Sequence, residues 1–186
     1  GYLMCTDNMP SGSALRLGDI VVMRGGKTVE VINTDAEGRM VMGDALALAS
    51  EAKPDILVDV ATLTGAQMIA LGTHVAAVMS NTDALAKQLA DAGELVGERF
   101  WHMPLPDALR ATLKSPIADL KNIGDQFGGM LVAGLFLEAF VPDGQAWAHL
   151  DIAGVDWNAK KSPLCPVGAS GFGARTLLEL ARGGVQ

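Results

Sequence analysis

Apolar positions along the chain alternate between short β-branched runs and longer stretches rich in alanine and leucine. The first two short runs, 19–23 and 28–32, are joined through a Gly-Gly pair at 25–26, which is a strong signal for a β-hairpin. In the second run Val29 and Val31 alternate with polar residues, as in a strand with one buried face. The pattern therefore predicts an antiparallel hairpin.

The rest of the chain alternates predicted strands with predicted helices. The strands are short and β-branched, whereas the helices are longer and either apolar throughout or amphipathic. Strands are predicted at 56–60, 74–80 and 146–152. Helices are predicted at 40–50, 127–140 and 174–181, and one more is predicted to begin after a cap at Asn81 or Thr82. This alternation indicates an α/β protein of three-layer α/β/α architecture with a largely parallel central sheet. The hairpin is expected to make that sheet mixed, and 56–60 is expected at its centre.

Composition narrows the class of protein. The 186 residues suffice for one domain with a sizeable core, and a hydrophobic content of 49% excludes general disorder. With 14 Lys+Arg and 21 Asp+Glu the net charge is −7, so neither nucleic acid nor a membrane is an expected partner. No apolar stretch predicts a transmembrane segment. Cys5 and Cys165 are far apart and belong to no CxxC pair, so reduced thiols are expected.

Charged side chains are concentrated in the segment 33–39 (Asn-Thr-Asp-Ala-Glu-Gly-Arg), between the run 28–32 and a helix. In extended backbone Asp35 and Glu37 would point the same way, and two adjacent carboxylates favour a divalent cation between them. Arg39 carries a planar fork that suits a carboxylate or bicarbonate. The alternative is structural: Asp35 caps the helix, Glu37 completes its first turn, and Arg39 pairs with one of them.

Several segments, in the right order, resemble the leucine (cytosol) aminopeptidase family. The segment 33–39 is similar to the signature of that family. The other matching segments are 7–12 (Asp-Asn-Met-Pro-Ser-Gly), 59–66 (Asp-Val-Ala-Thr-Leu-Thr-Gly-Ala), 118–122 (Ala-Asp-Leu-Lys-Asn), 128–129 (Gly-Gly) and 148–154 (Ala-His-Leu-Asp-Ile-Ala-Gly). The resemblance covers essentially the whole chain. It implies a two-metal hydrolase of peptide catabolism that removes N-terminal, preferably leucine-like apolar residues from peptides.

The resemblance also implies roles for individual residues. Asp35 and Glu37 would bind two divalent metal ions, Zn²⁺ or Mn²⁺ before Mg²⁺ or Co²⁺, which activate a water molecule. Gly38 and Arg39 would hold a bicarbonate ion as general base, which makes Arg39 the catalytic side chain. The substrate-binding residues would be Asn33, Thr62, Leu63, Gly65 and Ala153. The resemblance further implies a cytoplasmic homo-hexamer acting on peptide substrates.

The resemblance also implies site residues that this chain does not contain. In the family, two lysines and two aspartates lie upstream of the segment 7–12, which only six residues precede here. Residues 1–186 are therefore expected to be the C-terminal portion of one catalytic domain, and the apolar start at 1–5 is expected to lie inside that domain. The chain alone is expected to lack several metal ligands. The alternative is a non-catalytic oligomerisation or interaction module of the same fold.

The remaining polar candidates have structural interpretations. Asp59 and Asp151 lie in apolar strands, where a lone charge is costly, so each is expected to accept hydrogen bonds from loop amides rather than bind a metal. Taken alone, 62–65 would be a strand-to-helix turn with a threonine cap. No histidine has a second His or Cys at ligand spacing, so core or surface positions are expected for His74, His102 and His149.

Overall fold

The predicted hairpin is present in the computed structural model, which describes residues 1–7, 9–161 and 163–183. Strand β1 (Ile20–Val22) pairs antiparallel with β2 (Thr28–Glu30). Gly25 and Gly26, in the connection, have φ angles of 85° and 90°. Side chains with a Cβ rarely adopt such angles, so the Gly-Gly pair is required by the turn.

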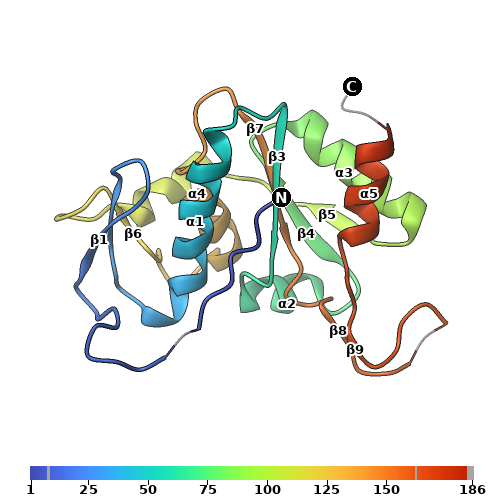
Figure 1. The fold of residues 1–186 in the computed structure, drawn as a ribbon, viewed down its shortest axis with the longest axis horizontal. Helices are drawn as coiled ribbons and strands as arrows, with labels where there is room; N and C mark the ends of the chain where they lie inside the picture. Colours follow the sequence, from blue (N-terminus) through green and yellow to red (C-terminus); the bar gives the residue numbers. More distant parts are fainter. Residues whose placement is uncertain (8, 162, 184–186) are drawn as a thin grey trace. The chain divides into compact units, whose positions relative to one another are not determined.

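The chain divides into two compact units, each with its own sheet and helices (Figure 1). Unit 1 comprises Gly1–Pro54 and Pro106–Gln145, and unit 2 comprises Asp55–Leu105 and Ala146–Gln186. The predicted α/β class with mixed sheets is confirmed. Among the helices of the described residues, none is both long and apolar enough to span a bilayer.

Unit 1 contains a three-stranded sheet in the order β1-β2-β6, in which β6 (Leu120–Lys121) runs parallel to β2. Val29 and Val31 are buried, so the predicted alternation is confirmed. The prediction that the hairpin makes the central sheet mixed is wrong, because the hairpin belongs to this separate sheet. The second edge of β2 pairs with β6, a strand of two residues that is too short to produce a hydrophobic pattern.

The helices of unit 1 are α1 (Glu37–Ser50) and α4 (Gly129–Glu138). Both predicted helices are confirmed, although α1 begins three residues earlier and α4 is shorter at both ends than predicted. The packing is tight, since a Cβ at Gly43 of α1 would lie 2.9 Å from the ring of Phe140. Two 3-10 helices complete the unit, η1 (Thr34–Ala36) and η2 (Asp107–Leu113).

Unit 2 is built on a four-stranded sheet in the order β3-β7-β4-β5. Its strands are β3 (Ile56–Ala61), β4 (Ala76–Ser80), β5 (Phe100–His102) and β7 (Ala146–Asp151). The pairs β3–β7 and β4–β5 are parallel, and the antiparallel β4–β7 pair makes the sheet mixed. The strand predicted at 56–60 lies at the edge of this sheet rather than at its centre. The apolar side chains of this run indicate that its faces are buried, but they do not indicate which strands pair with its backbone.

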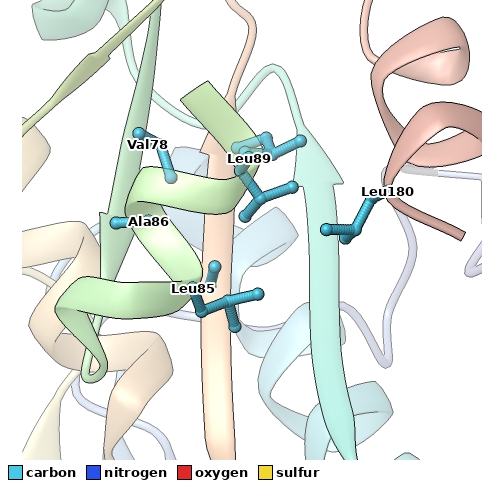
Figure 2. Close-up of a cluster of buried hydrophobic side chains, with 7 residues drawn as sticks. Val78, Leu85, Ala86, Leu89 and Leu180 are labelled. Carbon is cyan, nitrogen blue, oxygen red and sulfur yellow. The ribbon is translucent and has the colours of Figure 1, made fainter. Parts of the chain in front are cut away.

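Helices α3 (Asp83–Val96) and α5 (Ala174–Gly183) lie side by side in unit 2 (Figure 1), and α2 (Gly65–Leu71) follows β3. Figure 2 shows side chains of α3 and α5 directed at the strands. This core consists of Val78, Leu85, Ala86, Leu89, Ala148, Leu150 and Leu180. A two-stranded sheet of β8 (Trp157–Asn158) and β9 (Gly168–Ala169) precedes α5.

A buried carboxylate holds the start of α5. Glu98, 1% exposed, accepts hydrogen bonds at Oε2 from Gly173 N (3.1 Å), Thr176 N (3.0 Å) and Thr176 Oγ1 (2.7 Å). Its Oε1 accepts one from Arg175 Nε (3.2 Å). These contacts satisfy amides that the first turn of a helix leaves without partners, which fixes α5 to the segment that follows α3.

We expect Gly93→Ala, at the end of α3, to destabilise the protein by about 1–3 kcal/mol, because the core has no room for another methyl group. A Cβ at Gly93 would lie 2.3 Å from Glu98 O and 2.7 Å from the Phe100 ring. Denaturant unfolding of the full-length protein measures the effect. Leu95→Ala, at a position of the same helix that is 77% exposed, is the control and should unfold within about 0.5 kcal/mol of wild type. Equal stability of Gly93→Ala and the control would contradict this packing.

Candidate functional site

The segment 33–39 forms a capped helical turn in unit 1. Asn33 is the N-cap of η1, and its Oδ1 accepts a hydrogen bond from Asp35 N at 2.9 Å. Asp35 lies in η1 and Glu37 is the first residue of α1. The expectation of extended backbone, with both carboxylates pointing the same way, is therefore wrong, since residues two apart on a helix do not face each other. The predicted cap at Asp35 is also wrong, because Asn33 caps η1 and the N-cap of α1 is Ala36, which makes no side-chain cap bond.

The two carboxylates of this loop have different surroundings. Asp35 is exposed, whereas Glu37 is partly buried, and its Oε2 is buried without a hydrogen-bond partner in the described part of the chain. A buried carboxylate oxygen without a donor is costly, and contact with a cation would remove that cost. Glu37 therefore has the donor chemistry of a metal ligand, and Asp35 offers a second carboxylate from the same loop. Among the described residues, however, no group of three or more His, Cys, Asp or Glu could hold an ion.

Asn122, just after β6, holds this loop in place. It is completely buried, and its Oδ1 accepts hydrogen bonds from Ile32 N (2.8 Å) and Asn33 N (3.2 Å). Its Nδ2 donates to Asn33 O at 2.6 Å. Arg39 Nη1 donates to Asn122 O at 3.1 Å, which orients the guanidinium. No sequence pattern indicates this role for Asn122, because its partners are 83–90 residues away along the chain.

Two further features of unit 1 bear on this loop. Thr28 N and Thr28 Oγ1 donate to Asp119 Oδ2 at 2.8 and 2.7 Å, and these bonds lower the pKa of Asp119. The ionised Asp119 thereby ties β6 to β2 beside Asn122. A Cβ at Gly38 would meet no atom within 4 Å, so the space beside this backbone is open.

The second group of predicted site residues lies in unit 2, where two neighbouring strands end. Because β3 and β7 are parallel and adjacent, the loops that follow them start side by side at the carboxyl ends of the two strands. Ile152 N donates a hydrogen bond to Ala61 O at 2.9 Å there. The structure thus brings together the loops that carry Thr62, Leu63, Gly65 and Ala153. Thr62 and Gly65 are exposed, and Leu63 and Ala153 are partly buried.

The loop after β3 is also a capped helix start. Thr64 is the N-cap of α2, and its Oγ1 accepts a hydrogen bond from Gln67 N at 3.1 Å. The interpretation of 62–65 as a strand-to-helix turn with a threonine cap is confirmed. Its neighbours Thr62 and Gly65 nevertheless remain accessible.

The buried aspartates are hydrogen-bond acceptors, as predicted, but their donors differ. Asp151 accepts from the loop amides of Leu63 (3.1 Å) and Ala153 (3.3 Å) at Oδ1, which confirms the prediction. Asp59 instead accepts from two side chains of β7, Trp147 Nε1 (2.7 Å) and His149 Nδ1 (2.5 Å), so the prediction of loop amides is wrong there. The difference arises because Asp59 lies within β3, directly opposite His149, and not at the end of a strand.

The histidines occupy the expected kinds of position. His149 is buried in the core, and His74 and His102 are exposed. Cys5 is exposed and Cys165 is partly buried, and neither forms a disulfide within the described residues. Of the segment 7–12, Asn8 lies outside the described residues.

Comparison with known proteins identifies the family of this chain. The model of the cytosol aminopeptidase family, catalytic domain, matches residues 1–178. The chain belongs to this family. The "Probable cytosol aminopeptidase" of Oleidesulfovibrio alaskensis is 53% identical over 186 residues, which are 100% of this chain and 36% of that protein. That of Streptomyces avermitilis is 56% identical over 182 residues, 97% of this chain and 36% of its own length.

Solved structures of family members have the same fold. A variant of tomato leucine aminopeptidase superposes with a TM-score of 0.88 at 43% identity, over 93% of this chain and 33% of that one. The bottromycin maturation enzyme BotP in complex with Mn superposes with a TM-score of 0.86 at 45% identity, over 92% of this chain and 39% of BotP. The chain thus spans little more than a third of the length of the curated cytosol aminopeptidases that it matches.

Proposed function

We propose that residues 1–186 are the C-terminal portion of one catalytic domain of a metal-dependent aminopeptidase. The enzyme would hydrolyse the N-terminal, preferably leucine-like residue from peptides. Family membership supports the reaction class. The observation that carries the proposal is the buried, unpartnered Oε2 of Glu37 within the segment 33–39. Since relatives are almost three times as long, the remaining metal ligands would come from outside this chain.

Glu37 and Asp35 would be the metal ligands that residues 1–186 supply. When bound, a pair of divalent ions supplies Lewis acidity for water and for the scissile carbonyl. The ions would be Zn²⁺ or Mn²⁺, with Mg²⁺ or Co²⁺ as further possibilities, and the structure of BotP in complex with Mn supports manganese. Arg39 would bind bicarbonate through its planar, permanently charged fork, next to the open space beside Gly38. The main-chain carbonyl of Asn122 accepts a hydrogen bond from that guanidinium at 3.1 Å.

The accessible loops of unit 2 would contact the substrate. Thr62, Gly65 and Ala153 would line the pocket for the N-terminal side chain, and the backbone of Leu63 would face the peptide. Asn33, in unit 1, is proposed as a further substrate-binding residue. Hexameric assembly in the cytoplasm, with peptides as partners and neither nucleic acid nor membrane involved, completes the proposal.

A second candidate is a non-catalytic assembly module of the same fold. It is favoured by one observation, that no three potential ligands cluster among the described residues. The two candidates differ in metal binding by the full-length protein. Two ions per chain would support the enzyme, and none would support the module.

We expect the full-length protein to hydrolyse leucine p-nitroanilide and to lose this activity with a chelator. Zn²⁺ or Mn²⁺ should restore it. N-acetyl-leucine p-nitroanilide should not be cleaved, because acetylation removes the basic amine that marks the end of a peptide. The absorbance of the released p-nitroaniline measures the rates of hydrolysis of both substrates. Cleavage of the acetylated substrate, or activity that survives removal of all metal, would contradict the proposal.

A further inference from the structure

Asp151, the last residue of β7, links the loop that follows β3 to the loop that follows β7. Its side chain is completely buried. Oδ1 accepts hydrogen bonds from Leu63 N (3.1 Å), Thr64 N (3.4 Å) and Ala153 N (3.3 Å), and Oδ2 accepts one from Thr64 Oγ1 (2.7 Å). A buried carboxylate is tolerated only when it is fully hydrogen-bonded, and here every donor belongs to one of the two loops.

Gln67 makes a second link between the same loops. Its completely buried side chain accepts a hydrogen bond from Gly154 N at Oε1 (2.6 Å) and donates from Nε2 to Val75 O (2.7 Å). Thr64 Oγ1, which donates to Asp151, also accepts from Gln67 N. One continuous network therefore runs from Asp151 through Thr64 and Gln67 to Gly154.

The close approach of the loop after β7 to α2 and its C-cap depends on a glycine. A Cβ at Gly154 would lie 2.2 Å from Gly72 O and 2.8 Å from Gln67 Oε1. No side chain fits there without moving backbone, so this contact holds the loop after β7 against the end of α2, and the network links it to the loop after β3. Buried networks of this kind hold one arrangement because each lost bond leaves a buried group without a partner.

We propose that Asp151 is a positioning residue that sets the selectivity of the enzyme for the N-terminal side chain of its substrate. The inference rests on the proposed function, in which Thr62, Leu63, Gly65 and Ala153 contact the substrate. Because Asp151 is completely buried, it would act without touching the substrate. It acts by holding the main chain of Leu63 and Ala153 at a fixed separation.

Selectivity is the property most sensitive to this spacing. A hydrophobic pocket discriminates by about 10- to 200-fold for each methylene group, and only while its walls stay in contact with the side chain. Loosened walls would lose the contacts that a leucine side chain makes and an alanine side chain does not. The donors to Asp151 in the described contacts all lie outside the segment 33–39, so the metal-binding carboxylates should be unaffected.

The test compares kcat and KM of the full-length protein on leucine and alanine p-nitroanilides. Asp151→Asn keeps the size of the side chain but replaces the acceptor of Thr64 with a donor. Thr64→Val removes the hydroxyl with little change of shape, and Thr64→Ser keeps the hydroxyl as the matched control. We expect Asp151→Asn and Thr64→Val to lower the leucine-to-alanine ratio of kcat/KM about 10-fold, mainly through a higher KM for leucine. Thr64→Ser should keep the wild-type ratio.

The outcomes separate positioning from simple destabilisation. An unchanged ratio in both folded variants would overturn the inference, as would an equal loss for both substrates that lies entirely in kcat. If Asp151→Asn does not fold, the comparison of Thr64→Val with Thr64→Ser decides the question. If the wild-type protein is active and the variants Asp151→Asn and Thr64→Val keep its leucine-to-alanine ratio of kcat/KM, this inference alone is overturned. A wild-type protein without metal-dependent aminopeptidase activity overturns the proposed function as well.

Discussion

Replacing Glu37 with glutamine is expected to lower kcat of the full-length enzyme by about 10³-fold or more, a loss of at least ~4 kcal/mol of transition-state stabilisation. Glutamine has the size of glutamate, but it puts an uncharged amide in place of the carboxylate whose Oε2 is buried without a partner. Such a group cannot balance the charge of a cation. Steady-state hydrolysis of leucine p-nitroanilide at saturating Mn²⁺ measures the effect.

A matched control separates this effect from a general change of charge. Glu51, directly after α1, is exposed and pairs with Arg24 at 2.8 Å. Glu51→Gln removes the same charge and should leave kcat within about threefold of wild type, because exposed ion pairs contribute little. Without metal, Glu37→Gln should unfold no earlier than wild type, since it removes the charge of a carboxylate whose Oε2 is buried without a hydrogen-bond partner among the described residues. A kcat for Glu37→Gln equal to that of the control would contradict the assignment of Glu37 as a ligand.

Replacing Asp59 with leucine is expected to destabilise the protein by about 3 kcal/mol. The substitution removes the acceptor of both Trp147 Nε1 and His149 Nδ1, and neither donor has water as a substitute, because both residues are completely buried. Asp59→Asn should cost less, about 1 kcal/mol, because its carbonyl oxygen still accepts one of the two bonds. Denaturant unfolding of the full-length protein measures both values.

The control for Asp59 lies four residues earlier in the chain. Asp55 is exposed just before β3, and Asp55→Leu should change stability by less than about 0.5 kcal/mol. If Asp59→Leu is as stable as Asp55→Leu, the side-chain network between β3 and β7 does not stabilise unit 2. If Asp59→Asn is the more damaging of the two Asp59 variants, the hydrogen-bond argument is wrong.

Local sequence patterns predicted the elements of the fold but not their partners. The Gly-Gly turn at 25–26, the valines of β2 and the apolar helices depend on residues close together in the chain, and these predictions are confirmed. The pairing of β2 with β6 and the edge position of β3 depend on contacts between distant segments. A single sequence contains no periodicity that reports such contacts.

The same distinction holds for the candidate site. The resemblance to a family identified the segment 33–39, but the helical turn that separates Asp35 from Glu37 follows from the cap at Asn33. The sequence assigns no supporting role to Asn122 or Glu98, and it assigns Asp151 only the role of a hydrogen-bond acceptor. Each is a buried polar side chain whose partners lie 75 or more residues away, apart from the bond of Asp151 to nearby Ala153. A polar residue inside an apolar strand is the available signal; it predicts loop amides as the donors, which is right for Asp151 and wrong for Asp59.

The metal content of the full-length protein, with and without the Glu37 carboxylate, tests the proposed metal site most directly. Elemental analysis after equilibration with Mn²⁺ or Zn²⁺ and removal of free ions gives the number of ions per chain. We expect two ions per chain in the wild-type protein and at most one in Glu37→Gln, with Glu51→Gln unchanged at two. A wild-type protein without bound metal, or a Glu37→Gln protein that keeps both ions, would contradict the assignment of Glu37 as a metal ligand.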